Sequence, residues 1–481
     1  MRARHRAARS PAERHGSPCA AVTAPTRRTA CKGGPEPAGE SLSQLRGTTS
    51  AGPPGPVSAH RAPPEARAWA HALGTAVAGI VTMLVIATLG LWAAGAADLP
   101  GGAFPSVVAA TVVVAAGGSV GLSGDVGALA QAHANLDAVP LSVTLAGALV
   151  TAAVFLLPLR HRAVAGTGEL LGRIGRTAVC WLVLLLLLAL AAAHDFRISV
   201  GNDLANQLGA ELGATPVIGF RADLPATLGV GLLWVLALLV LTFLISRRAP
   251  LSPRLLHFQD SVRPPAFAML QTLLAYAAIG LVIGIVELFT RGDPARTFAV
   301  IFLGLPNLAW MALGIGTGGG WVGHVDKAIG LPVPPALDQV LRTRGQRTLD
   351  LGSLAAHDGR VWLLVAVAAV VLLAVAFRAA VRSPARRPAW RHAVEMAVAL
   401  ALTLFTVGLL TRISASFGLS LIGVGDLGGG LGNGVTLDPQ LLRLLGVGLL
   451  WGLVTGFLGS LLARRVRHPG EVPAPQRPPE P

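Results

Sequence analysis

Long apolar runs follow one another along most of the chain, and short polar connections separate them. Residues 177–193 and 224–246 contain no charged side chain at all. Runs of about 20 apolar residues match the roughly 30 Å hydrocarbon core of a bilayer at a rise of 1.5 Å per residue. The pattern therefore predicts an all-α polytopic membrane protein.

A seven-residue sequence, LGVGLLW, occurs twice, at 228–234 and at 445–451. Such repetition at a fixed place relative to the apolar runs indicates an internal duplication. We expect a first membrane repeat at 68–248 and a second, tandem repeat at 249–467.

Two apolar runs are poor candidates for a full crossing. The run 104–116 is short and ends at Gly117, and the run from Phe298 is interrupted at Pro306 and ends in the glycine-rich stretch 314–320. Short or proline-broken segments are typical of re-entrant elements, whose irregular backbone is buried in protein. We therefore expect about eight transmembrane helices plus two re-entrant segments, one in each repeat.

Arginine is concentrated in the stretches 160–176, 247–263, 378–391 and 464–467, whereas 96–137 and 413–439 contain no Lys or Arg. Cytoplasmic loops of membrane proteins carry the excess of basic residues. This places the basic loops and both termini in the cytoplasm. The net charge of +15 thus serves membrane orientation, and we expect no nucleic-acid partner.

The two ends of the chain differ from the rest in composition. Residues 1–67 are rich in Arg, Ala, Pro and Gly and have no apolar period, which predicts a disordered basic cytoplasmic tail. They lack the continuous apolar segment of a secretory signal. Residues 468–481 form a second disordered tail, rich in proline.

Motifs of enzymes and cofactor sites are scarce. The sequence has no Walker motif, no HExxH and no Cys/His cluster at ligand spacing, so we expect no cofactor and no metal. Gly121-Leu122-Ser123-Gly124 has the GxSG form of intramembrane serine proteases. Its partner histidine belongs on a later span, however, and His133 lies in the same loop. We therefore predict that the protein is not an enzyme.

Five residues are candidates for substrate binding. Asn307 follows the proline break, where freed backbone carbonyls need partners; the alternative is that it caps the broken helix. Arg197 and Arg412 precede the two LGVGLLW copies, as do Asp223 and Asp438. A two-fold charged vestibule is one interpretation of this set, and anchoring of span ends at the interface is the other.

Several segments together resemble the streptophobe family, very hydrophobic membrane proteins of Streptomyces and relatives. The segments are ADLPGGAFPSVV (97–108), PLRHRAVAG (158–166), GFRADLPATLG (219–229), RRAPLSPRLL (247–256), FLGLPNLAWMALGIG (302–316) and HDGR (357–360). The resemblance implies a bacterial cell membrane and carries over no catalytic or binding residue.

Repeats with glycine- and proline-interrupted segments at matching positions usually place a substrate site between the halves. The leading hypothesis is a permease or secondary transporter that binds a small-molecule substrate, with Asn307 and the turns 117–124 and 314–320 beside the path. The alternative is a non-transporting membrane scaffold or assembly factor whose basic tails recruit a partner. An enzyme acting on a lipid-linked substrate would require the arginine and aspartate set. The oligomeric state stays open.

Overall fold

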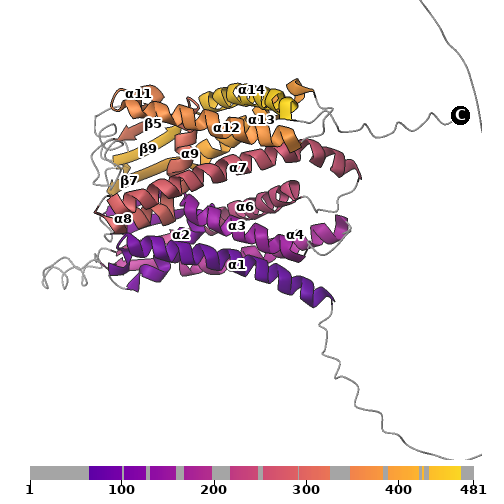
Figure 1. Cartoon of the computed structure of the whole chain (residues 1–481). Helices are drawn as coiled ribbons and strands as arrows, with labels where there is room; N and C mark the ends of the chain where they lie inside the picture. Colours follow the sequence, from indigo (N-terminus) through magenta and orange to yellow (C-terminus); the bar gives the residue numbers. More distant parts are fainter. Residues whose placement is uncertain are drawn as a thin grey trace, which may run out of the picture. The chain divides into compact units, whose positions relative to one another are not determined.

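Apolar helices make up most of the structure and run alongside one another (Figure 1). The computed structural model describes residues 64–99, 102–125, 130–158, 167–197, 217–246, 253–290, 292–325, 347–382, 388–421, 425–426 and 433–466. The helices of the first half, residues 64–246, are α1 (Pro64–Ala93), α2 (Phe104–Ala115), α3 (Leu141–Leu156), α4 (Thr167–Ala191) and α6 (Leu224–Ile245). Those of the second half, residues 253–466, are α7 (Pro253–Thr290), α8 (Pro294–Ala299), α9 (Leu305–Gly316), α11 (Leu351–Ala355), α12 (Trp362–Arg382), α13 (Ala389–Leu410) and α14 (Leu441–Val466).

In the described residues, eight helices are long and apolar enough to cross a membrane. They comprise α1, α4, α6, most of α7, the combined segment Pro294–Gly316, α12, α13 and α14, while α2 and α3 are shorter. The chain is therefore a multi-pass integral membrane protein, as predicted. These eight helices differ from the eight crossings expected from the sequence, because Pro294–Gly316 is long enough to cross and α3 is shorter.

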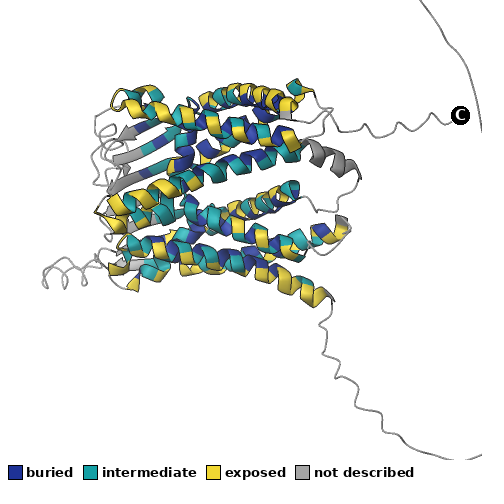
Figure 2. Ribbon diagram, viewed as in Figure 1, coloured by how far each residue is buried: buried dark blue, intermediate teal, exposed yellow. Residues whose placement is uncertain are grey.

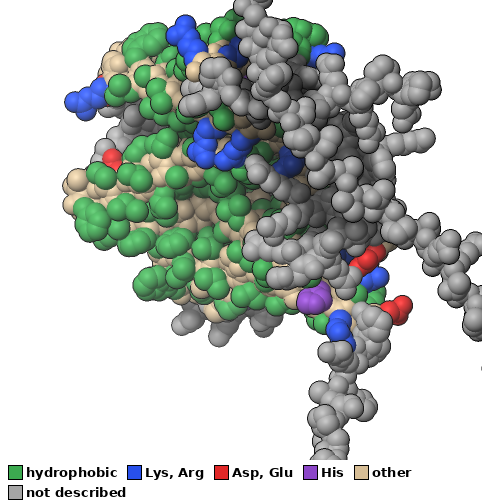
Figure 3. Space-filling view, turned by 45° about the vertical axis from the view of Figure 1, so that its right-hand side comes forward, with side chains coloured by type: hydrophobic (Ala, Val, Ile, Leu, Met, Phe, Trp, Pro, Cys, Tyr) green, Lys and Arg blue, Asp and Glu red, His purple; other side chains and the backbone are tan. Residues whose placement is uncertain are grey.

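The outward faces of the helices suit a lipid environment. On α1, an exposed apolar position recurs every three or four residues, in a stripe that Trp69 and Trp92 bracket. These two tryptophans are about 35 Å apart at 1.5 Å per residue, the spacing expected of aromatic anchors at two membrane surfaces. Figure 2 shows exposed positions along α1 and α14, and Figure 3 shows a broad hydrophobic surface with few visible charges.

The described residues also form a sheet of nine strands at one end of the helices, which an all-α prediction did not anticipate (Figure 1). The first half contributes β1 (Val120–Asp125), β2 (Ala130–Ala138), β3 (His194–Arg197) and β4 (Val217–Ala222). The second half contributes β5 (Gly320–Val325), β6 (Arg347–Asp350), β7 (Ile413–Leu421), β8 (Gly425–Asp426) and β9 (Asn433–Pro439). All pairings are antiparallel, and the strand order is β3-β4-β1-β2-β7-β9-β5-β6, with β8 beside β7.

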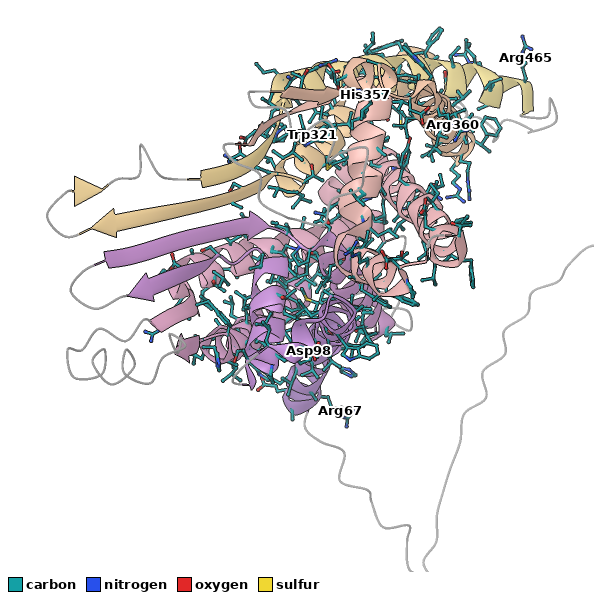
Figure 4. All side chains as sticks on the ribbon, turned by 90° about the vertical axis from the view of Figure 1, so that its left-hand side faces the viewer. Arg67, Asp98, Trp321, His357, Arg360 and Arg465 are labelled. Carbon is teal, nitrogen blue, oxygen red and sulfur yellow. The ribbon has the colours of Figure 1, made fainter. Side chains whose placement is uncertain are left out.

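The order of strands within each half is the same. The first half has the order β3-β4-β1-β2, and the second half has the order β7-β9-β5-β6. In both, the first strand follows the penultimate long helix, the second precedes the last helix, and the other two are an antiparallel pair from earlier in that half. The two sets meet at one seam, where β2 pairs with β7 from Ala130 opposite Leu421 to Ala138 opposite Ile413. Figure 4, viewed from the sheet end, shows strands of the two halves side by side.

Two turns that lead from a helix into the sheet have the same conformation. Gly117 after α2 has a φ of 90°, and Gly318 after α9 has a φ of 95°. Only glycine adopts such angles readily. In each turn, the N–H of the following glycine donates to the carbonyl five residues back, at 2.9 Å and 2.8 Å. Gly117 faces Val230 and Gly318 faces Val447, the same valine in the two LGVGLLW copies.

Some prolines in the second half lie within helices or directly after a helix irregularity. Pro264 and Pro265 lie inside α7, which already begins at Pro253 and continues through both. The predicted break around Pro306 takes the form of a π-helical segment at Val300–Gly304 that precedes the proline. Such a segment accommodates a helix irregularity without ending the helix.

Candidate functional site

A cavity of about 710 Å³ lies between the two halves. It is bordered by α3 and α6 of the first half and by α7, α9 and α13 of the second. Its length follows α3 from Leu141, beside the sheet, to Leu156 at the opposite end. The volume falls within the range of about 300–1,000 Å³ that is usual for ligand sites. The lining side chains are Leu141, Thr144, Leu145, Ala148, Leu149, Ala152, Leu156, Leu238, Leu241, Thr242, Ile245, Ser246, Leu270, Leu273, Trp310 and Leu410.

The few polar groups in this lining already have partners. The Thr144 hydroxyl donates to Ala115 O at 2.8 Å, and the Thr242 hydroxyl donates to Leu238 O at 2.7 Å. The indole N–H of Trp310 donates to Leu273 O at 3.1 Å. Because the remaining lining is aliphatic except for Ser246 at one end, the cavity favours an apolar chain over a polar solute.

Asn307 lies on α9 but binds the chain that enters α3. Its Nδ2 donates to Val139 O at 2.9 Å, and its Oδ1 accepts from the N–H of Leu141 at 3.1 Å. The Leu141 N–H belongs to the first turn of α3, where helices leave their donors without an internal partner. Asn307 therefore caps a helix of the other half, rather than its own helix, and is not among the residues that line the cavity.

Of the four charged candidate residues, the structure shows the second-half pair, Arg412 and Asp438, in contact. Arg412 and Asp438 form an ion pair, with Nε and Oδ1 2.7 Å apart, just before β7 and within β9. Their side chains are 61% and 45% exposed. An ion pair this exposed contributes about 0–1 kcal/mol, so it does not make a buried charged site.

The first half does not reproduce this pair at Arg197 and Asp223. Arg197 is the Cα partner of Val217 at the start of β4, whereas Asp223 follows the end of that strand. The two residues are thus roughly 20 Å apart along β4. Asp223 caps α6 by accepting from the N–H of Ala226 at 3.4 Å. A two-fold charged vestibule made of these four residues is therefore not formed.

A polar cluster at the end of β6 was not predicted. Asp350 accepts from the N–H of Ser353 at 2.9 Å, and Arg443 of α14 donates to its other carboxylate oxygen at 3.1 Å. The backbone hydrogen bond from Ser353 is the largest factor that lowers the pKa of Asp350, with a further contribution from Arg443. Asp350 caps α11 and exchanges hydrogen bonds with Ser353, and aspartate is among the residues preferred at this position. His357 and Arg360, in the HDGR segment, follow this cluster (Figure 4).

Ser123 of the GxSG segment and His133 are Cα partners on the adjacent strands β1 and β2. The same-loop histidine is therefore closer than the spacing suggested. A serine nucleophile also needs a group that orients its histidine. The other cross-strand neighbour of His133 is Gly418, and Asp195 lies on the serine side, beyond Gly219. Among the described strands, no carboxylate residue is a Cα partner of His133.

Within the described residues, no group of three or more His, Cys, Asp or Glu side chains could hold a metal ion. No family model, curated protein or solved structure matches the chain.

Proposed function

We propose that the chain is a permease-like membrane protein that admits an apolar or amphipathic molecule between its two halves. The observation that carries this proposal is the cavity at the contact of α3 and α6 with α7, α9 and α13. A path between two repeats is the usual arrangement of transporters built by duplication. The aliphatic lining narrows the substrate class from a polar solute to one with a hydrocarbon portion.

The proposal includes a tandem duplication. The identical strand order of the two halves supports it, as do the equivalent turns at Gly117 and Gly318. A further match is the bond from Asp223 N–H to Ser119 O at 3.1 Å, which corresponds to that from Gln440 N–H to Gly320 O at 2.9 Å. Each bond joins the start of the last helix of its half to a sheet-entry turn.

We also propose eight crossings and two re-entrant segments, with α3 crossing and Pro294–Gly316 not crossing. The segment Pro294–Gly316 starts just after α7 has reached the sheet end and leads directly into β5 of the sheet (Figure 1). A segment with both ends on one side does not cross. By contrast, α3 connects β2 to the arginine-rich stretch 160–176. The sheet then lies outside a bacterial cell membrane, and both termini are cytoplasmic.

Filling the cavity tests the proposal. Leu241→Trp places a large side chain into the cavity from α6, and Val240→Trp is its matched control, because the adjacent Val240 is exposed and does not line the cavity. Purified protein in liposomes would be labelled with a phospholipid that carries a photoreactive diazirine in its acyl chain. Mass spectrometry would then locate the adducts.

We expect adducts on α3, α6 and α7 in the parent protein and in Val240→Trp, and a several-fold loss in Leu241→Trp. Transfer of a fluorescent-tailed lipid between the leaflets should fall in parallel. Equal labelling of all three proteins at the cavity would contradict a binding path there. Photolabelling of the cavity without lipid transfer between the leaflets would indicate a lipid-binding protein and contradict a permease.

The alternative, a non-transporting scaffold or assembly factor, draws support from the sheet, which projects beyond the helices (Figure 4) and whose outermost described strands have one neighbour each. Deleting residues 1–60 separates the two functions. A scaffold that recruits through this basic segment should lose its partner, whereas a permease should keep its lipid transfer.

A further inference from the structure

The two outermost strands of the sheet have only one neighbour each among the described residues. β3 pairs with β4, and β6 pairs with β5. A strand at a sheet edge presents a row of backbone donors and acceptors that can pair with another chain. These edges are at opposite ends of the strand order, so the described strands form an open sheet.

The open edges are equivalent to the strands that form the seam. In the common order of the two halves, β3 takes the place of β7, and β6 takes the place of β2. At the seam, β2 and β7 pair over nine residues each. The β2–β7 seam within one chain thus joins strands that are equivalent to the two outermost described strands, β6 and β3.

We propose that β6 of one molecule pairs with β3 of a second copy, in the antiparallel manner of the β2–β7 seam. A membrane favours this contact, because every copy has the same orientation and holds its sheet at the same height. The described edge strands are four residues long. The contact is therefore shorter than the seam, and it depends on confinement of the copies to one surface. Such a contact is head-to-tail, so it generates a ring when the rotation closes.

The seam fixes the register of the proposed contact. Thr348 pairs with Val322, which pairs with Asp438; in the first half, Asn135 pairs with Gly121, which pairs with Arg221. Asp438 and Arg221 each lie three positions before the last helix of their half, so Thr348 is equivalent to Asn135.

By the same comparison, Arg197 is equivalent to Ser416. Arg197 pairs with Val217 and Ser416 pairs with Gly434, and both partners occupy the same position relative to the last helix. Since Asn135 and Ser416 are Cα partners at the seam, Thr348 of one copy should lie opposite Arg197 of the next.

Cysteine pairs test this contact in full-length protein that lacks Cys19, Cys31 and Cys180. Thr348→Cys and Arg197→Cys would be placed on two differently tagged copies, coexpressed and oxidised in native membranes. We expect a disulfide-linked heterodimer on a non-reducing gel. A double variant carrying both cysteines should form a ladder of covalent oligomers.

Two controls define the outcomes. Gln131→Cys with Ser420→Cys, Cα partners at the seam, should give a disulfide within one chain and show that the sheet has formed. Thr436→Cys on β9, a strand with neighbours on both sides, should not link to Thr348→Cys of another copy. If the double variant forms a disulfide within one chain and none between chains, β3 and β6 of the same molecule meet. If the seam control forms its disulfide and Thr348→Cys and Arg197→Cys form none, the two edges do not meet. Either result overturns the proposal.

Discussion

At the scale of single residues, Asn307 shows what a sequence motif leaves open about a side chain's partners. The sequence places Asn307 next to a proline break, which makes a polar role predictable. It cannot show that the partners, Val139 and Leu141, come from the other half of the chain. Arg197 and Asp223 illustrate the opposite case, because similar neighbouring letters suggested an equivalence that the strand register does not support.

Replacing Asn307 should lower stability. Asn307→Ala leaves a backbone donor and a backbone acceptor at the start of α3 without their partners, at a cost of about 1–3 kcal/mol. We expect a lower midpoint of thermal unfolding in detergent, together with looser contact between α9 and α3.

The matched variant is Leu308→Ala, on the adjacent, exposed position of α9. Its midpoint should change little. If Asn307→Ala unfolds like the parent protein but loses substrate transfer, the residue binds substrate instead of joining the two halves.

At the scale of elements, close packing of α14 on α13 depends on glycine. A Cβ on Gly452 would lie 2.4 Å from Ala397 Cα, and one on Gly456 would lie 2.9 Å from Ala393 Cα. Glycines at every fourth position let membrane helices approach at the backbone, where dispersion contacts accumulate. This face was not predictable from hydrophobicity, since α14 is apolar on all sides over most of its length and its glycines occur at positions 446, 448, 452, 456 and 459.

Gly452→Ala should destabilise the protein. The added methyl group meets backbone atoms of α13 that cannot rotate away, and overpacking of this kind costs about 1–3 kcal/mol. Gly446→Ala is the control on the same helix, because no atom lies within 4 Å of its built Cβ. Thermal unfolding should show a clear loss for Gly452→Ala and little change for Gly446→Ala. Equal losses would mean that backbone flexibility, not contact with α13, determines the effect.

At the scale of the whole molecule, the number of long apolar helices was predictable and the sheet was not. A run such as Leu224–Ile245 identifies a membrane helix from a single segment. Strands such as Val120–Asp125, with the sequence VGLSGD, are short and rich in glycine, so they give little strand signal. Ile413–Leu421, with the sequence ISASFGLSL, does alternate apolar and polar residues and was a strand signal that the sequence carried. The partners of these strands are in remote segments, so the pairing itself was not predictable.

Labelling from outside intact cells should divide the connections into two groups. In a background without native cysteines, probes at positions 165, 255 and 385 should be protected, and probes at 210 and 430 should react with a membrane-impermeant maleimide. The basis is that the arginine-rich connections and the sheet lie at opposite ends of the helices. If 255 and 385 fall on opposite sides, Pro294–Gly316 crosses the membrane and the two halves are inverted.

The seam between β2 and β7 also sets an order for biogenesis. β2 is synthesised before α3, and its partner follows only after α13. During synthesis β2 therefore has no partner for its β7 edge until the helices between the two strands have been made. Contacts between such remote segments form slowly, because the chain loses the entropy of loop closure before the contacts stabilise it. Formation of the β2–β7 seam thus depends on the placement of the helices from α3 to α13, which separate the two strands in the chain.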